Sequence, residues 1–125
     1  MTNIFVIDTE TTGLDGFPND NVVEIGIVRV EVEQGKVHPV LSTLVGVSPE
    51  SLDVNAWVFQ NTDLHVQDVM DAPREVDVSL AVRCLLRGQI LTSYNKNFDF
   101  GRFLNFPPWS LGNNPESECI MLAAS

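Results

Sequence analysis

A short apolar run that ends in two acidic residues constrains the fold of this chain more than any other feature. Residues 4–7 read Ile-Phe-Val-Ile, and Asp8, Thr9 and Glu10 follow them directly. An apolar run of this length, bounded by a turn that contains glycine, predicts a strand buried on both faces of a sheet. Side chains at i and i+2 of a strand point to the same face, roughly 6.6 Å apart, so Asp8 and Glu10 would be neighbours.

Two neighbouring carboxylates at the end of a buried strand repel each other and are costly to remove from water. A hard divalent cation such as Mg²⁺ or Mn²⁺ removes both penalties, because these ions prefer carboxylate and water oxygens as ligands. The alternative is that the strand ends at Ile7 and that Asp8 begins a solvated turn. The spacing of the two acids is compatible with both interpretations.

Glu24 is a second acidic residue in an unexpected position. In a strand predicted over residues 22–32, counting in steps of two places Glu24 on the apolar face with Gly26 and Val28. That position predicts a buried carboxylate beside Asp8 or Glu10 on the adjacent strand. The alternative is a bulge or a change of register near the start of the strand.

Asp99 is the third acidic residue of interest. It follows a short strand predicted over residues 90–93 and lies in the first turn of a helix predicted over residues 97–104, where the helix dipole favours a negative charge. The carboxyl end of a strand is also a position from which a side chain reaches a cleft at the edge of a sheet. The alternative is an ordinary acid at a helix start, paired with Arg102 three residues later.

The other patterns predict an α/β fold with a mixed sheet. The expected strands cover residues 4–7, 22–32, 37–45, 90–93 and 119–122, and the second strand has Val28, Val30 and Val32 on one face. The expected helices cover residues 49–60, 75–86 and 97–104, the second of them on the apolar stripe Val78, Ala81, Val82 and Leu85, and residues 61–73 are expected to be irregular. A turn at Gln34-Gly35-Lys36 joins the second and third strands into a hairpin. The first three strands thus form an antiparallel meander, and parallel strands with flanking helices complete the sheet.

Charge and composition limit the classes of function. The 125 residues include 7 Lys plus Arg and 17 Asp plus Glu, so the formal net charge is 7 − 17 = −10. No broad basic surface is therefore available for long nucleic acid, and a nucleic-acid function would act through a small metal-loaded site. No apolar run approaches the ~20 residues that span a membrane, and the N-terminus lacks the basic region of a signal peptide. We expect a single cytoplasmic domain over residues 1–125, with Cys84 and Cys119 as buried or free thiols.

Taken together, these features resemble the DEDD superfamily of 3′–5′ exonucleases, of the DEDDh type. Residues 5–14, Phe-Val-Ile-Asp-Thr-Glu-Thr-Thr-Gly-Leu, resemble its first exonuclease motif, and residues 95–99, Asn-Lys-Asn-Phe-Asp, resemble the second. Residues 23–28 resemble the second strand of the family, and residues 71–76 resemble its approach to the first long helix. The polymerase III epsilon proofreading subunit, ribonuclease T and oligoribonuclease belong to this superfamily.

The resemblance implies a ribonuclease H-like fold and hydrolysis of phosphodiester bonds at the 3′ end of single-stranded DNA or RNA by a two-metal mechanism. Asp8, Glu10 and Asp99 would then be the catalytic residues and the Mg²⁺ or Mn²⁺ ligands. Asp8 would bridge both ions, Glu10 would hold the ion that carries the attacking water, and Asp99 would hold the other. The residues implied to bind the terminal nucleotide are Thr11, Thr12, Gly13, Leu14, Asn95 and Phe98. Of these, residues 11–14 would turn backbone N–H groups to phosphate or sugar and Leu14 would pack on a base; the alternative for Leu14 is a core residue beside a turn.

The family's third motif has no counterpart in this chain. In the family, a His or Tyr base and a fourth metal-binding Asp lie on a last long helix. Residues 118–121 resemble the strand before that helix, but no Asp follows Asp99 and no His follows His65. We expect one metal to be weakly held, and the lost general-base assistance is worth ~10²–10⁴-fold. His65, Glu116 and Glu118 are minor candidates to substitute, and His38 is expected at the surface.

Three hypotheses therefore remain at the level of sequence. The first is an exonuclease domain that is truncated at its C-terminus and weak or incomplete as a catalyst. The second is a non-catalytic member that binds nucleotide ends or a protein partner through the same cleft. The third is a small acidic interaction module without a metal site. Because the absent helix would leave one sheet face bare, we also expect a second copy of the chain or another polypeptide to cover that face.

Overall fold

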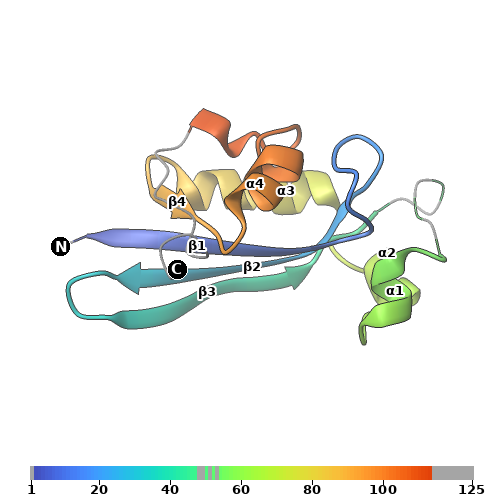
Figure 1. The fold of residues 1–125 in the computed structure, drawn as a ribbon, viewed down its shortest axis with the longest axis horizontal. Coiled ribbons are helices and arrows are strands. Elements are labelled where there is room, and N and C mark those ends of the chain that lie inside the picture. The colour runs from blue at the N-terminus through green and yellow to red at the C-terminus, as the bar shows by residue number, and fades with distance from the viewer. Residues whose placement is uncertain (1, 48–49, 51, 53, 114–125) are drawn as a thin grey trace.

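The structure is a computed structural model of the chain, and it describes residues 2–47, 50, 52 and 54–113. Its centre is a four-stranded sheet in the order β3-β2-β1-β4 (Figure 1). The strands are β1 (Asn3–Thr11), β2 (Val22–Glu31), β3 (Lys36–Leu44) and β4 (Ile90–Thr92). The first three form an antiparallel meander, and β4 runs parallel to β1. The mixed sheet predicted from the sequence is therefore confirmed.

Helices cover one face of this sheet. The helical elements are α1 (Trp57–Asn61), α2 (Val66–Met70), α3 (Glu75–Leu86), α4 (Lys96–Phe98), the π-helix η1 (Asp99–Leu104) and the 3₁₀ turn η2 (Leu111–Asn113). Figure 1 shows α3 and α4 on the same face, with α1 and α2 beyond one end of the sheet. The longest described helix, α3, has 12 residues, and no described helix is long and apolar enough to cross a membrane.

Strand β1 continues through the acidic residues. It pairs with β2 in register from Asn3 to Glu10, so the alternative in which Asp8 begins a solvated turn is wrong. Ile7 and Thr9 are buried on the helix-covered face, whereas Asp8 is exposed and Glu10 is half-buried on the other face. The expectation of a strand buried on both faces is also wrong, because the described helices cover only one of them and Ile4 and Val6 on the other face are half-buried.

In β2, the valines predict that the face with Val28 and Val30 is covered, but the helices cover the opposite face. Ile25 and Ile27 are fully buried under the helices, whereas Val28 and Val30 lie on the open face and are only half-buried. The alternation of β2 was correctly predicted, but both of its faces carry apolar residues. Periodicity alone therefore does not reveal which face the helices cover.

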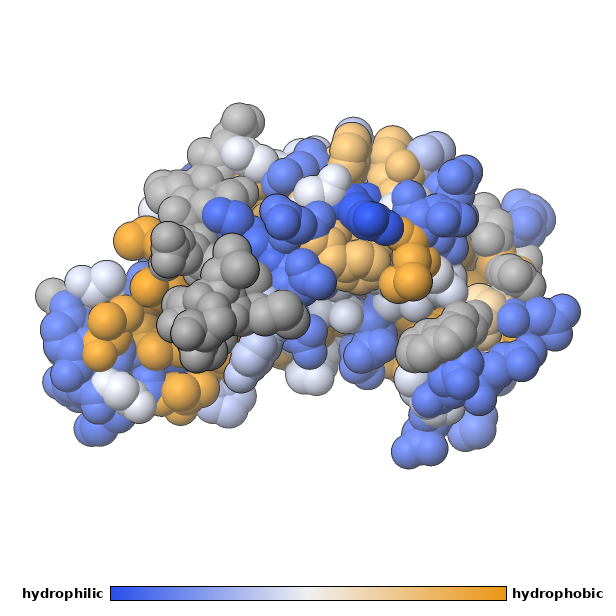
Figure 2. Space-filling model, in the orientation of Figure 1, coloured by the Kyte–Doolittle hydropathy of each residue, from blue (hydrophilic) through white to orange (hydrophobic). Residues whose placement is uncertain are grey.

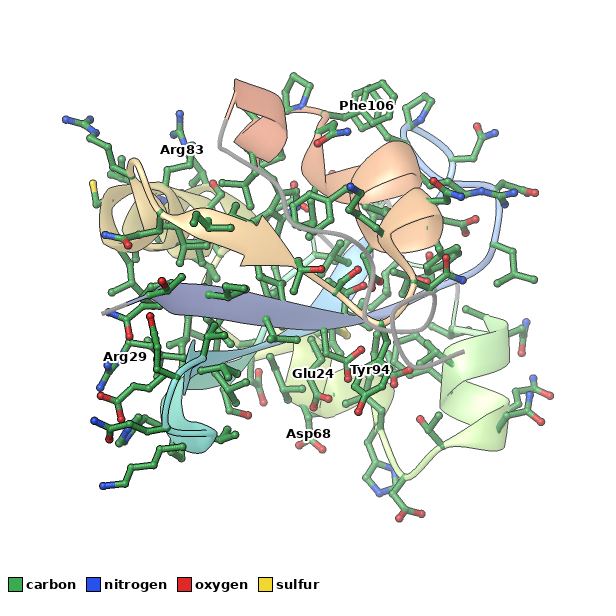
Figure 3. The ribbon with its side chains drawn as sticks, turned by 60° about the vertical axis from the view of Figure 1, so that its left-hand side comes forward. Glu24, Arg29, Asp68, Arg83, Tyr94 and Phe106 are labelled. Atoms are coloured by element: carbon green, nitrogen blue, oxygen red, sulfur yellow. The ribbon has the colours of Figure 1, made fainter. Side chains whose placement is uncertain are left out.

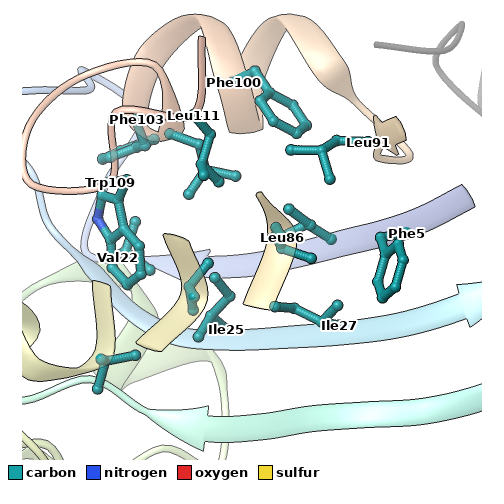
Figure 4. Packing of buried hydrophobic residues seen from close by; sticks show 14 of the residues in the cluster. Phe5, Val22, Ile25, Ile27, Leu86, Leu91, Phe100, Phe103, Trp109 and Leu111 are labelled. Atoms are coloured by element: carbon teal, nitrogen blue, oxygen red, sulfur yellow. The ribbon is translucent and has the colours of Figure 1, made fainter. Parts of the chain in front are cut away.

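The main core fills the layer between the helices and the covered face of the sheet (Figure 4). Its members include Phe5, Ile7, Ile25, Ile27, Leu86, Leu91, Phe100, Phe103, Trp109 and Leu111. Trp109 is 2 % exposed, so its indole ring packs within this core. Burying such aromatic and aliphatic side chains contributes about 1.5–3 kcal/mol each before entropy costs.

Helix α3 occupies the range predicted for it, but its buried stripe is rotated. Val78, Val82 and Leu86 are buried at positions i, i+4 and i+8, whereas Ala81 and Leu85, which were predicted in the stripe, are exposed. Arg87 ends the helix and Gly88 follows with a φ of +72°, the left-handed conformation that glycine adopts at low cost.

The segment between β3 and α3 differs from prediction. The helix expected from residue 49 begins only at Trp57, and α2 forms inside residues 61–73, which were predicted to be irregular. These short helices bury a second apolar cluster made of Val23, Leu52, Ala56, Val58 and Val69. Short helices have weak local sequence signals, so tertiary packing of this kind determines whether they form. The helix predicted over residues 97–104 is confirmed as α4 with η1, and the strand predicted over residues 119–122 lies outside the described residues.

The open face of the sheet carries an apolar groove. It has a volume of about 490 Å³, and its lining includes Val6, Asp8, Val28, Leu41 and Tyr94. Elsewhere, hydrophobic side chains reach the surface among polar ones, as the orange patches in Figure 2 show. The expectation that a second copy or another polypeptide covers the bare face stays a prediction.

Candidate active site

Asp8 and Glu10 project from the part of β1 that extends beyond its parallel neighbour. Strand β4 pairs with β1 only at Ile4, Phe5 and Val6, so the following stretch of that edge is free of β4. On the other side, Asp8 lies opposite Gly26, which has no side chain to fill the space beside the carboxylate. The predicted pair of acids thus stands at the end of the sheet with room around it.

Glu24 lies directly opposite Glu10 on β2. The register also shifts immediately afterwards, because Thr11 pairs with Val22 and leaves Val23 as the extra residue of a bulge. The predicted position beside Glu10 and the predicted bulge are therefore both correct, but the predicted burial is not, because Glu24 is only half-buried. Two like charges directly opposite each other destabilise a sheet unless something compensates for them.

Asp99 reaches the edge of β1 from the helical side. Its side chain is 4 % exposed, and the Thr9 hydroxyl donates a hydrogen bond of 2.7 Å to its Oδ1 atom. Burial raises the pKa of Asp99, hydrogen bonding from Thr9 and the nearby Ser93 hydroxyl opposes the rise, and the charge of Asp8 adds to it. The pairing of Asp99 with Arg102 is therefore wrong, because Arg102 donates instead to the carbonyl oxygen of Leu14.

Ser93 completes the surroundings of Asp99. It is fully buried and close enough to influence the carboxylate, yet its Oγ atom makes no hydrogen bond of normal geometry within the described part of the chain. The Ser93 hydroxyl thus has the Asp99 carboxylate as its neighbour, in a contact that lowers the pKa of Asp99 but lacks ideal hydrogen-bond geometry. Ser93 and Asp99 therefore form a small polar region inside an otherwise apolar layer.

The three predicted acids interact electrostatically. Burial raises the pKa of Glu10 above its ordinary value of 4.5, and the charges of Asp8, Glu24 and Asp99 raise it further. Asp8 likewise raises the pKa of Asp99. The structure thus brings Asp8, Glu10 and Asp99 into one electrostatic neighbourhood.

A divalent cation fits this neighbourhood by donor chemistry. Carboxylate oxygens are hard ligands of the kind that Mg²⁺ and Mn²⁺ prefer, and a cation would relieve the repulsion that raises the pKa of Glu10. Within residues that the structure describes, however, no three His, Cys, Asp or Glu side chains converge closely enough to hold one ion. Asp8 and Glu10 project from the open face of β1, whereas Asp99 accepts a hydrogen bond from Thr9, whose side chain lies on the covered face. The three carboxylates therefore approach β1 from different faces.

A second acidic pocket opens beside Glu10. It has a volume of about 310 Å³ and is lined by Glu10, Glu24, Thr62, Asp63, Leu64 and Asp68. Figure 3 shows Glu24 and Asp68 together on one side of β1. Asp63, between α1 and α2, and Asp68, within α2, therefore add two further carboxylates near the site, and His65 is the exposed residue just before α2. His38, by contrast, is at the far hairpin, where its Nε2 atom lies 2.7 Å from Glu31.

The loop after β1 holds the residues predicted to contact a terminal nucleotide. The Thr12 amide donates to the Asn21 carbonyl, so it is not available for phosphate as predicted. The amides of Gly13 and Leu14 have no acceptor within the described residues. Leu14 is 71 % exposed, so the alternative that it is a core residue is wrong.

Asp20 closes this loop. Its Oδ1 atom accepts from the Thr12 hydroxyl at 3.0 Å, and its Oδ2 atom accepts from the Asp15 amide at 2.9 Å. A Cβ atom at Gly13 would lie 2.7 Å from Asp20 Oδ1, so only glycine fits there without movement of the Asp20 side chain. The loop is thus pre-organised by a carboxylate that the sequence analysis did not single out.

The second motif residues have clear structural roles. The Asn95 side chain accepts from the Phe98 amide and caps α4. Phe98 is half-buried, with its ring 5.4 Å from that of Phe103 and under the guanidinium of Arg102 at 5.9 Å. Substrate binding by Asn95 and Phe98 stays a prediction.

Several functional candidates escaped sequence reasoning. Thr9 and Ser93 were missed because a hydroxyl between apolar residues gives no pattern of its own, although a polar residue on the buried face of a strand is a usable signal. Asp63 and Asp68 were missed because the segment was assigned as irregular. Glu116 and Glu118 lie outside the described residues.

Comparisons with known proteins agree with this arrangement. A family model described as "Exonuclease" (ribonuclease T type) matches residues 5–118. No curated protein shows a significant match to this chain.

Among solved structures, a product-bound exonuclease I has a TM-score of 0.74 at 15 % identity, and the match covers 98 % of this chain and 31 % of that one. E. coli Exonuclease I in complex with a dA16 oligonucleotide has a TM-score of 0.67 at 16 % identity, covering 94 % and 28 %. A 3′-exonuclease in a study of 3′-end recognition of histone mRNA stem-loop has a TM-score of 0.66 at 19 % identity, covering 82 % and 50 %.

At these identities the likeness shows the fold alone, which is the expected ribonuclease H-like fold. The chain spans half or less of the length of each of these proteins.

Proposed function

Since the chain belongs to this exonuclease family of the DEDD superfamily, we propose that it is a metal-dependent 3′–5′ exonuclease that acts on single-stranded DNA or RNA. Asp8, Glu10 and Asp99 are the proposed Mg²⁺ or Mn²⁺ ligands and catalytic residues. Thr11, Gly13, Leu14, Asn95 and Phe98 are the proposed contacts to the terminal nucleotide.

One observation carries the proposal. Glu10 is surrounded by the negative charges of Asp8, Glu24 and Asp99, and burial and repulsion together raise its pKa. Such a cluster of like charges lowers the stability of the fold when no cation is bound. Carboxylates in a cleft whose pKa is shifted by burial and by neighbouring charges are typical of functional sites.

The chemistry follows from the positions of the chain's own groups. In hydrolysis, a water oxygen bonds to phosphorus while the bond from phosphorus to the 3′ oxygen breaks, which releases a nucleoside 5′-monophosphate. Bound divalent cations would supply a lowered water pKa and charge neutralisation on the phosphate. Thr9 holds the Asp99 carboxylate in place, and the amides of Gly13 and Leu14, which have no acceptor among the described residues, would donate to an anionic substrate.

The second candidate is a non-catalytic member that binds nucleotide ends or a protein partner. A specific observation favours it, because no described histidine lines the pockets beside the acids: His38 pairs with Glu31, and His65 is exposed before α2. Without a positioned base, water must lose its proton to solvent, which limits the rate.

Digestion of a single-stranded oligonucleotide tests the proposal. The substrate is labelled at its 5′ end and incubated with Mn²⁺ and the protein, its Asp8→Ala variant or its Asp77→Ala variant. Asp77 is an exposed acid on α3 whose partner is Arg74, so it serves as the matched control. We expect stepwise shortening by the protein and by Asp77→Ala, and loss of at least about a hundredfold in rate with Asp8→Ala.

Two results would contradict the proposal. Equal activity of Asp8→Ala would place the activity elsewhere. Absence of shortening, together with Mn²⁺ binding that requires Asp8, would favour the non-catalytic candidate.

A further inference from the structure

A second buried hydroxyl, that of Ser93, lies beside Asp99. Ser93 is fully buried and directly follows the last residue of β4. Strand β4 pairs with β1 so that Leu91 lies beside Phe5, and both of these residues belong to the main core (Figure 4). The same register, continued by two residues, places Ser93 on the covered face of the sheet. Ser93 therefore reaches Asp99 from the end of β4, whereas Thr9 reaches it from β1.

The two hydroxyls beside Asp99 differ in the hydrogen bonds that they make. The Thr9 hydroxyl donates to the Oδ1 atom of Asp99 at 2.7 Å. The Ser93 hydroxyl is close enough to lower the pKa of Asp99, but it makes no hydrogen bond of normal geometry within the described residues. A contact of poor geometry recovers only part of the hydrogen bonding to water that a buried hydroxyl gives up on folding. Ser93 thus has a donor whose capacity is not fully used.

The Asp99 carboxylate has acceptor capacity to spare as well. An ionised carboxylate has about four acceptor positions on its two oxygens, and Thr9 uses one of them. Asp99 approaches β1 from the covered face, whereas Asp8 and Glu10 project from the open face. Ligation of a shared cation therefore requires the Asp99 carboxylate to change its orientation. A second donor beside it can fix the new orientation.

We propose that Ser93 is a positioning residue, which completes its hydrogen bond to Asp99 when that carboxylate binds a divalent cation. The inference rests on the proposed function, because it assigns a role at the same metal site. Hydrogen-bond donors to a ligating carboxylate fix its orientation, and their removal typically weakens metal binding about 10–100-fold. Ser93 acts on the cation through Asp99 and does not ligate it.

A purely structural role for Ser93 fits the observations less well. A hydroxyl that only supports the fold makes its hydrogen bond in the metal-free protein. Ser79 is such a case, because it is also fully buried and its hydroxyl donates to the Val76 carbonyl at 3.0 Å. Ser93 is equally buried but lacks a bond of that quality. The two serines therefore differ in the condition under which each hydroxyl contributes.

Two measurements on the same variants test the inference without requiring catalysis. One is a titration with Mn²⁺ followed by water-proton relaxation, and the other is thermal unfolding of the metal-free protein in EDTA. Ser93→Ala removes the hydroxyl, and Ser93→Cys keeps a side chain of similar size but replaces the hydroxyl by a weak donor. Ser79→Ala removes the other fully buried serine hydroxyl and is the matched control.

We expect Ser93→Ala to weaken Mn²⁺ binding about tenfold and to leave the midpoint of metal-free unfolding unchanged, because the bond that it removes is poorly formed without metal. Ser93→Cys should weaken Mn²⁺ binding in the same direction. Ser79→Ala should show the reverse pattern, a lower midpoint with unchanged Mn²⁺ affinity, because its hydrogen bond is already made.

Mn²⁺ binding by Ser93→Ala that is as tight as that of the unaltered protein would overturn the inference. If Ser93→Ala does not fold, Ser93→Cys decides, and an unchanged Mn²⁺ affinity in that variant would have the same meaning.

Failure of the proposed function gives a different result. Absence of saturable Mn²⁺ binding by the unaltered protein would remove the metal site and the inference with it. Mn²⁺ binding that requires Asp8 but not Ser93 would overturn the inference alone. Mn²⁺ binding that requires both residues, without shortening of an oligonucleotide, would support the inference and remove the exonuclease.

Discussion

The carboxylate of Asp99 is buried at the edge of β1, and the Thr9 hydroxyl is its strongest partner. Burying a carboxylate is costly unless hydrogen bonds compensate, and the raised pKa of Asp99 shows that compensation is incomplete. Thr9 stands between Asp8 and Glu10 in the sequence but faces the other side of β1. Thr9 therefore links the segment of β1 that carries Asp8 and Glu10 to Asp99 through a hydrogen bond.

Replacing Thr9 by valine tests this connection. The valine keeps the β-branched shape but leaves Asp99 with one donor fewer, so we expect Thr9→Val to lower the free energy of unfolding by about 1–3 kcal/mol. The pKa of Asp99, followed by NMR, should rise further. Thr43→Val is the control, because the Thr43 hydroxyl bonds only the neighbouring carbonyl of Leu44. Equal unfolding of Thr9→Val and the unaltered protein in urea would contradict this role.

The cross-strand pair of Glu10 and Glu24 leads to a prediction about pH. Because the pKa of Glu10 is raised above 4.5, its favourable contribution to stability is fully present below that pH and is lost as pH rises through the raised pKa. Without metal, Glu24→Gln should therefore stabilise the protein by about 0.2–1 kcal/mol at neutral pH and have little effect near pH 3.

The same substitution elsewhere on β2 provides the control. Glu31 is also half-buried, but it pairs with His38 and Arg29, so Glu31→Gln should not stabilise the protein. Urea unfolding across pH 3–8 compares the two variants. A stabilising effect of equal size in both would show that the like-charge pair is not the cause.

At the scale of elements, the loop between β1 and β2 links the strand that carries Asp8 and Glu10 to η1. Within the loop, the Asp20 carboxylate accepts hydrogen bonds from Thr12 and Asp15. From η1, the Arg102 guanidinium donates to the Leu14 carbonyl of the loop. The loop is therefore a fixed extension of β1 and not a flexible connection. Its geometry depends on the two acceptor oxygens of one side chain.

Removing those oxygens should loosen the loop. We expect Asp20→Ala to expose the amides of residues 12–21 to hydrogen exchange and to lower stability by about 1–2 kcal/mol, since two hydrogen bonds are lost. Asn19→Ala is the control, because Asn19 is exposed and makes no hydrogen bond to other described residues. Exchange rates that are the same in both variants would contradict the assigned role of Asp20.

The sequence predicted a helix or strand correctly where the local pattern of apolar and turn residues was strong. Strand β1 and the boundaries of α3 were predicted because a continuous apolar run and a terminal glycine are strong signals. Helix α2 was not, because five residues give little periodicity and packing of Val69 decides its formation. The acids Asp8, Glu10 and Asp99 were found from strand and helix ends, but the Thr9 contact joins residues 90 positions apart and leaves no local trace.

At the scale of the whole molecule, the net charge of −10 defines what kind of nucleic-acid protein this chain can be. At physiological salt the Debye length is about 8 Å, so remote acidic residues repel a long polyanion only weakly, but no basic surface attracts it. We therefore expect no detectable binding of duplex DNA at 0.15 M salt under conditions where a single strand binds. Anisotropy with labelled duplex checks this, and binding of duplex as tight as that of single strand would contradict it.

The central claim is that Asp8, Glu10 and Asp99 form a site for divalent cations. The most direct measurement is a titration of the protein with Mn²⁺, followed by water-proton relaxation, for the unaltered chain and for Asp8→Asn, Glu10→Gln and Asp77→Asn. We predict saturable binding that Asp8→Asn and Glu10→Gln each weaken at least tenfold, and that Asp77→Asn leaves unchanged. Absence of binding, or binding that is equal in all four proteins, would contradict the claim.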